Sequence, residues 1–149
     1  ELYMVNDNEI IQTKIIHHLK KCPGYDIEKN YFFPNSILGK KLTDFSETLR
    51  KLPFDKFDIT FLSLGEDGHL AGHFSNSVFL EENKFCYTEN APKLPKKRIS
   101  FSLKSLMLSE LIVLVSIGEN KKEALNELKK GKSIHNKLIH HEGLILIHD

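Results

Sequence analysis

FDITFLSLGEDGHLAGHF, residues 57–74, is the stretch that indicates the fold most directly. Its apolar run at 59–64 is rich in β-forming residues and predicts a short buried strand. The chain then turns at 65–68, Gly-Glu-Asp-Gly, and presents His69. In open α/β sheets, ligands bind beyond the carboxyl ends of the strands. A strand that ends in this turn therefore predicts a reactive side chain at the edge of a sheet.

Strand and helix patterns alternate on both sides of this stretch. Strands are predicted at 2–5, 98–103, 111–117 and 144–147, with a short candidate at 84–88, and helices at 10–21, 43–52 and 121–130, with a turn of helix at 106–108. Residues 25–41 and the rest of 75–95 read as irregular connections. The run 111–117 is the most apolar, which is typical of a parallel strand buried on both faces. The alternation predicts an α/β fold with a mainly parallel sheet.

Length and composition describe an ordinary globular protein. The 149 residues are 40% hydrophobic and 28% charged, enough for one domain that buries roughly two thirds of its unfolded surface. A net charge of +1 argues against a nucleic-acid partner, which needs a strongly basic face. No run approaches the ~20 apolar residues that cross a bilayer. Cys22 and Cys86 have no metal or redox spacing, so we expect reduced thiols and a cytoplasmic location.

His69 is the first candidate for chemistry. A histidine with an ordinary pKa of ~6.5 exchanges protons at neutral pH, so His69 is either a general base or acid, or a residue that only caps the turn. Asp67 either orients His69 or satisfies the amides of the turn. His73 lies four residues on and suggests a metal pair. We do not favour a metal, because Leu70 stands where a glutamate of an HExxH pattern would follow His69.

Two cations complete the candidate site. Arg98 opens a predicted strand and suits phosphate or carboxylate oxygens, although a solvated charge at a strand end is the simpler interpretation. Lys121 follows the buried strand 111–117, again at a carboxyl edge. If the strand that carries Arg98 runs antiparallel to its neighbours, His69, Arg98 and Lys121 converge on one edge of the sheet. A basic edge with one histidine suits a small phosphorylated substrate.

Several motifs together resemble those of the 6-phosphogluconolactonases. Residues 57–74 resemble the family signature, an apolar strand followed by LGxGxDGHxASLF. KLPKKRISFSL, residues 93–103, is similar to the family stretch ending in PxxRIT, and LIVLVSIGENKKEAL, residues 111–125, to its strand followed by GxxK. LILIHD, residues 144–149, resembles its last strand and aspartate. The likeness runs from about 42 to 149, with the motifs in order.

The resemblance implies a fold and an activity. The fold is a three-layer α/β/α sandwich with a Rossmann-like sheet, and the reaction is hydrolysis of 6-phosphogluconolactone in the pentose phosphate pathway, with no cofactor or metal. His69 matches the catalytic histidine, which activates water. The substrate is then held by Gly65, Asp67, Gly68, Arg98 and Lys121. The family also leaves open a fusion with a glucose-6-phosphate dehydrogenase domain.

Departures from the family pattern qualify these expectations. The signature's ASLF is replaced by AGHF at 71–74, and the arginine of a DER segment is missing at 7–9. Nothing matches the family's N-terminal Gly-Gly-Ser phosphate loop, so we expect residues 1–149 to form one domain that is the C-terminal two thirds of the family fold. The alternative function is a weakened or inactive sugar-phosphate-binding module. Glucosamine-6-phosphate deaminase is disfavoured because AGHFSNS, residues 71–77, lacks the Asn-Glu-Pro of its DGHIAFNEP motif.

Overall fold

The computed structural model describes residues 2–3, 17–18, 20–21, 23, 31–32, 56–75, 80–82, 85–88, 90–94, 96, 98–133 and 135–149. The chain divides into two compact units, Glu1–Lys51 and Leu52–Asp149. In the first unit, β1 (Leu2–Tyr3) pairs in parallel with β2 (Tyr31–Phe32). The predicted strand at 2–5 begins as expected, whereas β2 lies in a connection predicted to be irregular. The predicted helix at 43–52 and most of the one at 10–21 lie outside the described residues.

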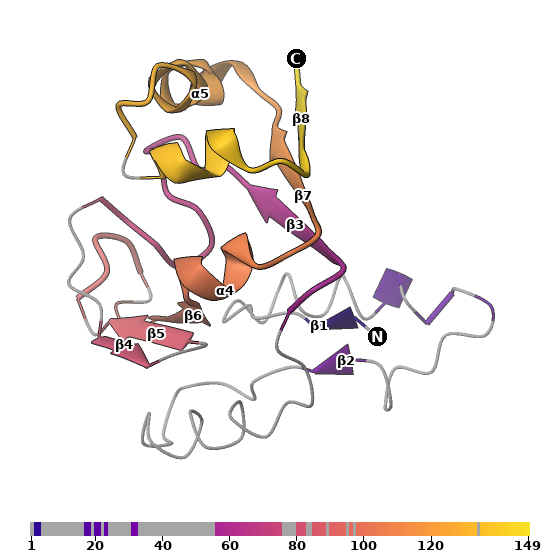
Figure 1. The fold of residues 1–149 in the computed structure, drawn as a ribbon. Helices are drawn as coiled ribbons and strands as arrows, with labels where there is room; N and C mark the ends of the chain where they lie inside the picture. The colour runs from indigo at the N-terminus through magenta and orange to yellow at the C-terminus, as the bar shows by residue number, and fades with distance from the viewer. Residues whose placement is uncertain are drawn as a thin grey trace. The chain divides into compact units, whose positions relative to one another are not determined.

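The second unit contains a parallel sheet in the order β3-β7-β8 (Figure 1). Its strands are β3 (Ile59–Ser63), β7 (Leu111–Ser116) and β8 (Leu144–His148), and both pairings are parallel. β7 leads through the 3-10 turn η1 (Glu119–Lys121) into helix α5 (Lys122–Lys129), and η2 (Asn136–His140) precedes β8. The predicted α/β class with a parallel sheet is therefore confirmed.

One face of this sheet carries the core. Leu62 and Leu64 lie on that face beside Ile112 and Leu114 of β7, and all four are buried. The amphipathic helix α5 adds buried Leu125 and Leu128. Burying a leucine or isoleucine side chain stabilises a fold by about 1.5–3 kcal/mol. Packing on this face therefore positions the carboxyl ends of β3 and β7, and with them the loops that follow.

The opposite face of the parallel sheet is apolar and exposed in part, with Val113 at its centre buried. Because side chains alternate along a strand, Ile59 and Phe61 of β3 share that face with Leu111 of β7 and with Ile145 and Ile147 of β8. Their exposed fractions run from 39% for Leu111 to 70% for Phe61. The prediction that β7 is buried on both faces is wrong at Leu111, because the described residues leave this end of the strand uncovered.

A second, antiparallel sheet in the same unit has the order β4-β5-β6. It consists of β4 (Leu80–Glu82), β5 (Phe85–Thr88) and β6 (Arg98–Phe101). β4 lies in the segment predicted as loop, and β6 ends before 103 because Ser102 caps the next helix, α4 (Leu103–Met107). The Ser102 hydroxyl accepts a hydrogen bond from the backbone N of Ser105 at 3.1 Å, a typical N-cap.

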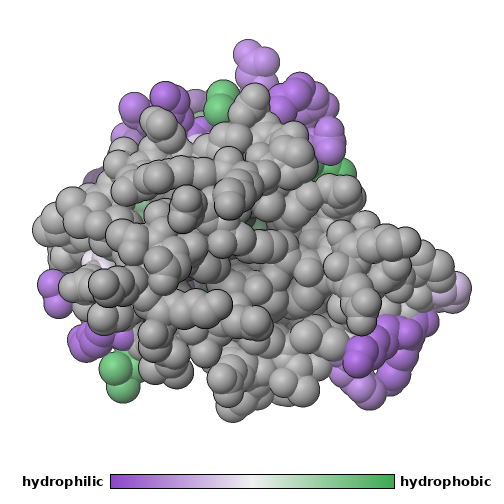
Figure 2. All heavy atoms as spheres, turned by 90° about the horizontal axis from the view of Figure 1, so that it is seen from below, coloured by the Kyte–Doolittle hydropathy of each residue, from purple (hydrophilic) through white to green (hydrophobic). Residues whose placement is uncertain are grey.

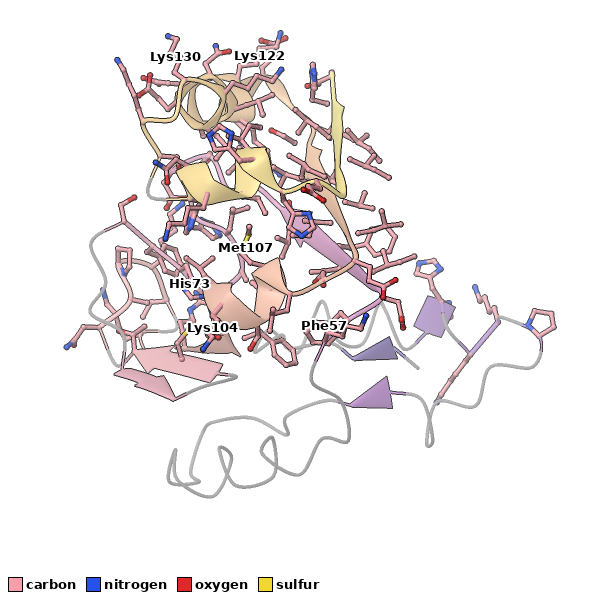
Figure 3. The ribbon with its side chains drawn as sticks, in the orientation of Figure 1. Phe57, His73, Lys104, Met107, Lys122 and Lys130 are labelled. Atoms are coloured by element: carbon pink, nitrogen blue, oxygen red, sulfur yellow. The ribbon has the colours of Figure 1, made fainter. Side chains whose placement is uncertain are left out.

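The described surface gives no sign of a membrane segment. None of the helices among the described residues is long and apolar enough to cross a bilayer. Seen from below, most of the described residues in view are hydrophilic (Figure 2). Lys122 and Lys130 lie at the two ends of α5 with their side chains directed outward (Figure 3).

Candidate active site

The turn at 65–69 follows β3 directly, at the carboxyl edge of the parallel sheet. The backbone N of Gly65 donates to the carbonyl of His69 at 2.9 Å, and the N of Gly68 donates to the carbonyl of Gly65 at 3.0 Å. Gly68 has φ 80°, a conformation that side chains with a Cβ rarely adopt. Hydrogen bonds within its own backbone therefore hold the turn, and they fix the backbone position of His69.

Gly65 has a second role, in seating the imidazole of His69. A Cβ on Gly65 would collide with Nδ1 and Cε1 of the His69 ring. The ring therefore occupies the space that a side chain at Gly65 would fill. Gly65 was predicted to contact a substrate. In the structure its observed neighbour is the imidazole, and its contact with a substrate stays a prediction.

Asp67 and His69 form a side-chain pair. Nδ1 of His69 contacts Oδ1 of Asp67, and since an ionised carboxylate only accepts, Nδ1 carries the proton in this contact. The lone pair of a neutral ring then lies on Nε2. Burial alone raises the pKa of Asp67, but hydrogen bonds from His69 and Lys93 outweigh it and lower the pKa to about 2. Oδ1 of Asp67 also accepts from the backbone N of His69 at 3.5 Å, so the carboxylate contacts the imidazole and satisfies an amide of the turn as well.

Arg98 approaches His69 by way of Phe74. The His69 ring stacks on Phe74, with centroids 4.5 Å apart and planes at 26°, and the guanidinium carbon of Arg98 lies 5.9 Å from the Phe74 centroid. Nη2 of Arg98 donates to the carbonyl of Leu94 at 2.7 Å. The expected route of convergence is wrong, because the strand of Arg98 belongs to the antiparallel sheet and not to the sheet of β3. Arg98 and His69 are linked instead through Phe74, whose ring both side chains contact.

Lys121 reaches the end of β3 from the loop after β7. Its Nζ lies 3.1 Å from the hydroxyl Oγ of Ser63. The neighbouring Asn120 donates from Nδ2 to Oε2 of Glu66 at 3.0 Å. The loops after β3 and β7 are thus joined at the sheet edge, which places Lys121 at the same end of β3 as the turn that carries His69.

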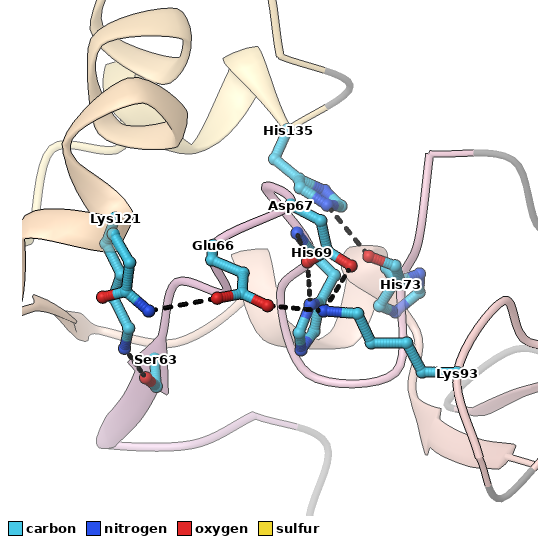
Figure 4. Close-up of polar contacts among 9 residues, drawn as sticks. Ser63, Glu66, Asp67, His69, His73, Lys93, Lys121 and His135 are labelled. Carbon is cyan, nitrogen blue, oxygen red and sulfur yellow. Dashed lines mark hydrogen bonds and ion pairs between the residues drawn. The ribbon is translucent and has the colours of Figure 1, made fainter.

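The turn at 65–69 and the side chains that contact it form one corner of the structure. Lys93 is a component of this corner that sequence reasoning did not identify. Its Nζ lies 3.2 Å from Oε1 of Glu66 and 3.1 Å from Oδ2 of Asp67 (Figure 4). Hydrogen bonds with Asp67 and Glu66 raise the pKa of Lys93, and the bonds from Lys93 and Asn120 lower that of Glu66. Lys93 lies in a segment between strands with no pattern of its own, so no sequence signal singled it out.

His73 belongs to the core, apart from the turn. It is 3% exposed, and its Nε2 donates to the carbonyl of Phe101 at 2.8 Å. The thiol of the buried Cys86 lies 3.4 Å from the same nitrogen. The carbonyl of His73 accepts a hydrogen bond from Nε2 of His135 at 3.2 Å. Within the described ranges, no group of three or more His, Cys, Asp or Glu side chains is arranged to hold a metal ion.

Fold and corner together define an α/β protein with an Asp–His pair at the carboxyl edge of a parallel sheet. A sequence profile described as "Glucosamine-6-phosphate isomerases/6-phosphogluconolactonase" matches residues 9–144. The chain belongs to this glucosamine-6-phosphate isomerase/6-phosphogluconolactonase family. The resemblance noted in the motifs at 57–74 and 93–125 is thereby confirmed at the level of the family.

Individual relatives agree with the family. A 6-phosphogluconolactonase of Borreliella burgdorferi is 43% identical over 84 residues, which cover 54% of this chain and 36% of the relative. The "Probable 6-phosphogluconolactonase 2" of Oryza sativa subsp. indica is 37% identical over 127 residues, 84% of this chain and 40% of the relative. The chain therefore spans less than half the length of these two curated relatives.

A solved structure supports the fold. The crystal structure of a 6-phosphogluconolactonase from Shewanella baltica has a TM-score of 0.63 to this chain. The match covers 80% of this chain and 56% of the other, at 17% sequence identity. Identity at this level carries the α/β fold and no more, so the chemistry of the corner has to be argued from its own residues.

Proposed function

We propose that this chain hydrolyses 6-phosphogluconolactone to 6-phosphogluconate, with His69 as the general base. The observation that carries the proposal is the Asp67–His69 pair, which directs the basic nitrogen of the imidazole away from its carboxylate partner. The pair lies on the DGH stretch that resembles the family signature, and two curated relatives of the chain bear the names 6-phosphogluconolactonase and probable 6-phosphogluconolactonase 2.

His69 can accept and return the proton that this reaction transfers. Nε2 of His69 takes a proton from water as the water oxygen attacks the lactone carbonyl carbon. The tetrahedral intermediate collapses by breaking the bond from that carbon to the ring oxygen, and the imidazolium returns the proton to this oxygen. Asp67 stabilises the imidazolium that forms in between, because its carboxylate stays ionised throughout.

Arg98 and Lys121 are proposed to hold the anionic end of the substrate. The guanidinium of Arg98 contacts Phe74, which stacks on His69, and Nζ of Lys121 contacts Ser63 at the end of β3. Phosphate is bound well by a guanidinium or an ammonium group placed in this way. Gly65, Asp67 and Gly68 are proposed to line the substrate as well. The pentose phosphate pathway and a cytoplasmic location belong to the same proposal.

The proposal is tested by His69→Ala. A positioned general base contributes about 10²–10⁴ in rate, so kcat for lactone hydrolysis is expected to fall by that factor while 6-phosphogluconate still binds in calorimetry. His140→Ala is the matched control, because His140 is exposed and lies outside the corner. Turnover of His69→Ala at the rate of the unchanged chain would sink the assignment.

A second candidate function is a binding module that holds sugar phosphates without turnover. It is favoured by two departures from the family pattern: the missing arginine at 7–9 and the replacement of ASLF by AGHF at 71–74. Calorimetry with 6-phosphogluconate beside a lactonase assay separates the two. Binding without hydrolysis supports the module, and hydrolysis that depends on His69 supports the enzyme.

A glucose-6-phosphate dehydrogenase domain in the same polypeptide stays a proposal about the context of this chain.

A further inference from the structure

The ammonium group of Lys93 is shared between two carboxylates of the turn. Its Nζ lies 3.1 Å from Oδ2 of Asp67 and 3.2 Å from Oε1 of Glu66. The other oxygen of Asp67, Oδ1, is the one that contacts Nδ1 of His69. One carboxylate therefore links the lysine to the imidazole, with a different oxygen facing each.

The backbone that carries Lys93 is anchored on both sides. Ala91 is fully buried, and its N donates to the carbonyl of Lys96 at 2.9 Å. The N of Asn90 donates to Oγ1 of Thr88, at the end of β5, at 3.3 Å. An anchored backbone reduces the entropy lost when the lysine side chain is held in one geometry. This contact is therefore better ordered than an isolated ion pair on a smooth surface.

From this geometry we propose that Lys93 is a positioning residue for the Asp67–His69 pair, resting on the proposed lactonase function. Asp67 lies in an exposed turn, and its carboxylate has rotational freedom about two side-chain bonds. Lys93 holds Oδ2, so Oδ1 stays directed at Nδ1 of His69. This fixes the imidazole in the tautomer whose lone pair is on Nε2, the nitrogen that has to receive the proton of water.

Glu66 supports this positioning role, because it holds Lys93 from the other side. Its Oε1 faces Lys93 and its Oε2 accepts from Nδ2 of Asn120 at 3.0 Å. Lys93 is thus held between two acidic side chains, an arrangement suited to orienting carboxylates. Direct capture of a phosphate would require the ammonium to leave both partners, which makes Arg98 and Lys121 the better candidates for that task.

The charged and titratable groups near His69 come from several elements. Asp67 lies on the same turn, Lys93 comes from the segment before β6, Arg98 stands behind Phe74, and His135 is near enough to be influenced electrostatically by His69. Of these groups, Lys93 is the cation that contacts the Asp67 carboxylate facing the ring. Removing its charge makes protonation of the pair easier, so the acidic limb of the activity profile moves to higher pH.

The first test compares Lys93→Met with Lys93→Arg and Lys122→Met. Misplacing a catalytic group by about 1 Å costs on the order of 10²-fold in rate, so Lys93→Met is expected to lower kcat about ten- to hundredfold with KM nearly unchanged. Lys93→Arg keeps a cation between both carboxylates and retains most of the activity. Lys122→Met removes an exposed ammonium that pairs with Glu119 and leaves kcat and the pH profile unchanged.

A double-mutant cycle with Asp67→Asn separates positioning from a general effect of charge. If Lys93 acts through Asp67, Lys93→Met adds little further loss in the Asp67→Asn background. Losses that multiply in the double variant would overturn the inference, as would an unchanged kcat and pH profile in Lys93→Met when the parent chain is active.

A measurement without turnover keeps the inference separate from the proposed function. Long-range ¹H–¹⁵N spectra of the imidazole report which ring nitrogen carries the proton. We expect one tautomer of His69, protonated at Nδ1, in the parent chain, in Lys93→Arg and in Lys122→Met, and a mixture in Lys93→Met. An unchanged tautomer in Lys93→Met refutes the positioning role whether or not the chain hydrolyses lactone, whereas absent hydrolysis by the parent refutes only the proposed function.

Discussion

Gly65 decides where the imidazole of His69 rests. The motif at 65–69 predicts a tight turn and a presented histidine, and both are found. The sequence does not reveal that the ring lies against the Cα of Gly65, because this contact depends on the side-chain rotamer of His69 as well as on the turn. The glycine is required at this position by a neighbour four residues away, as well as by the shape of the backbone.

Gly65→Ala is expected to remove activity while leaving the fold intact. The added Cβ displaces the His69 ring, which lies at the end of a side chain and moves more easily than backbone. A displaced base lowers kcat by about 10²-fold, with only a small change in Tm. Gly143→Ala is the matched control, because its Cβ meets the backbone of Glu110 and should lower Tm without disturbing His69. A Gly65→Ala variant with parental kcat would contradict the packing of the ring on Gly65.

The sequence alone does not predict the contacts that Lys93, Glu66 and Ser63 make. His69 stands out because glycines and an aspartate surround it within five positions. Lys93 is one lysine among several in 93–97, KLPKK, and its partner Asp67 is distant along the chain. Contacts of this kind become visible only when the second sheet has been built, so the sequence predicts the histidine and not the lysine that orients its partner.

β6 shows the same limit for a whole strand. Alternation of apolar and polar residues predicts a strand at 98–103, and β6 occupies Arg98–Phe101. The pattern gives no information about its partners, since any strand with one covered face alternates in this way. β6 pairs with β5 in an antiparallel sheet, which is why Arg98 reaches His69 through Phe74 and not along a shared edge.

The segment that leads into η2 is joined to the core through a neutral histidine. His135 is 2% exposed, its Nε2 donates to the carbonyl of His73, and its Nδ1 has no hydrogen-bond partner among the described residues. Burial lowers the pKa of His135 to about 4, and the charges of His73 and His69 act in the same direction, against the hydrogen bond to His73. The ring therefore stays neutral where a solvated histidine is already protonated.

This buried ring predicts a loss of stability in mild acid. The unfolded chain protonates His135 near pH ~6.5, whereas the folded chain does so only near a pKa of about 4. Between these values the unfolded state binds more protons, so the free energy of unfolding falls as pH is lowered from ~6.5 to about 4. His135→Gln retains a donor but cannot titrate, and its Tm should fall less over this range. Parallel Tm curves for both chains would contradict the neutral state of His135.

The apolar face of the parallel sheet is the largest feature of the second unit that its core does not explain. Ile59, Phe61, Ile145 and Ile147 are all between 45% and 70% exposed on it. Contiguous apolar surface of this kind favours association and dye binding, whereas scattered apolar residues do not. The predicted third layer of the fold, on which the three-layer sandwich depends, would lie against this face and stays a prediction.

Phe61→Thr is expected to reduce binding of the dye ANS and to raise solubility. Threonine is β-branched and suits a strand as an aromatic residue does, and Phe61 is 70% exposed, so the free energy of unfolding should change by no more than about 0.5 kcal/mol. Leu94→Ser is the matched control, because Leu94 is 79% exposed but lies outside the sheet face. Equal ANS fluorescence from Phe61→Thr and the parent chain would show that the face is covered in solution.

Glu66 has a consequence for how the molecule comes apart. Its carboxylate joins a lysine carried by the segment before β6 to an asparagine carried by the loop after β7, so the corner is assembled from two sheets that each keep their own hydrogen bonds. A partial opening that separates these sheets moves the proposed catalytic groups apart before either sheet unfolds. Any enzymatic activity of this chain would then be lost by an opening that costs less free energy than global unfolding. An activity assay would therefore report this partial opening.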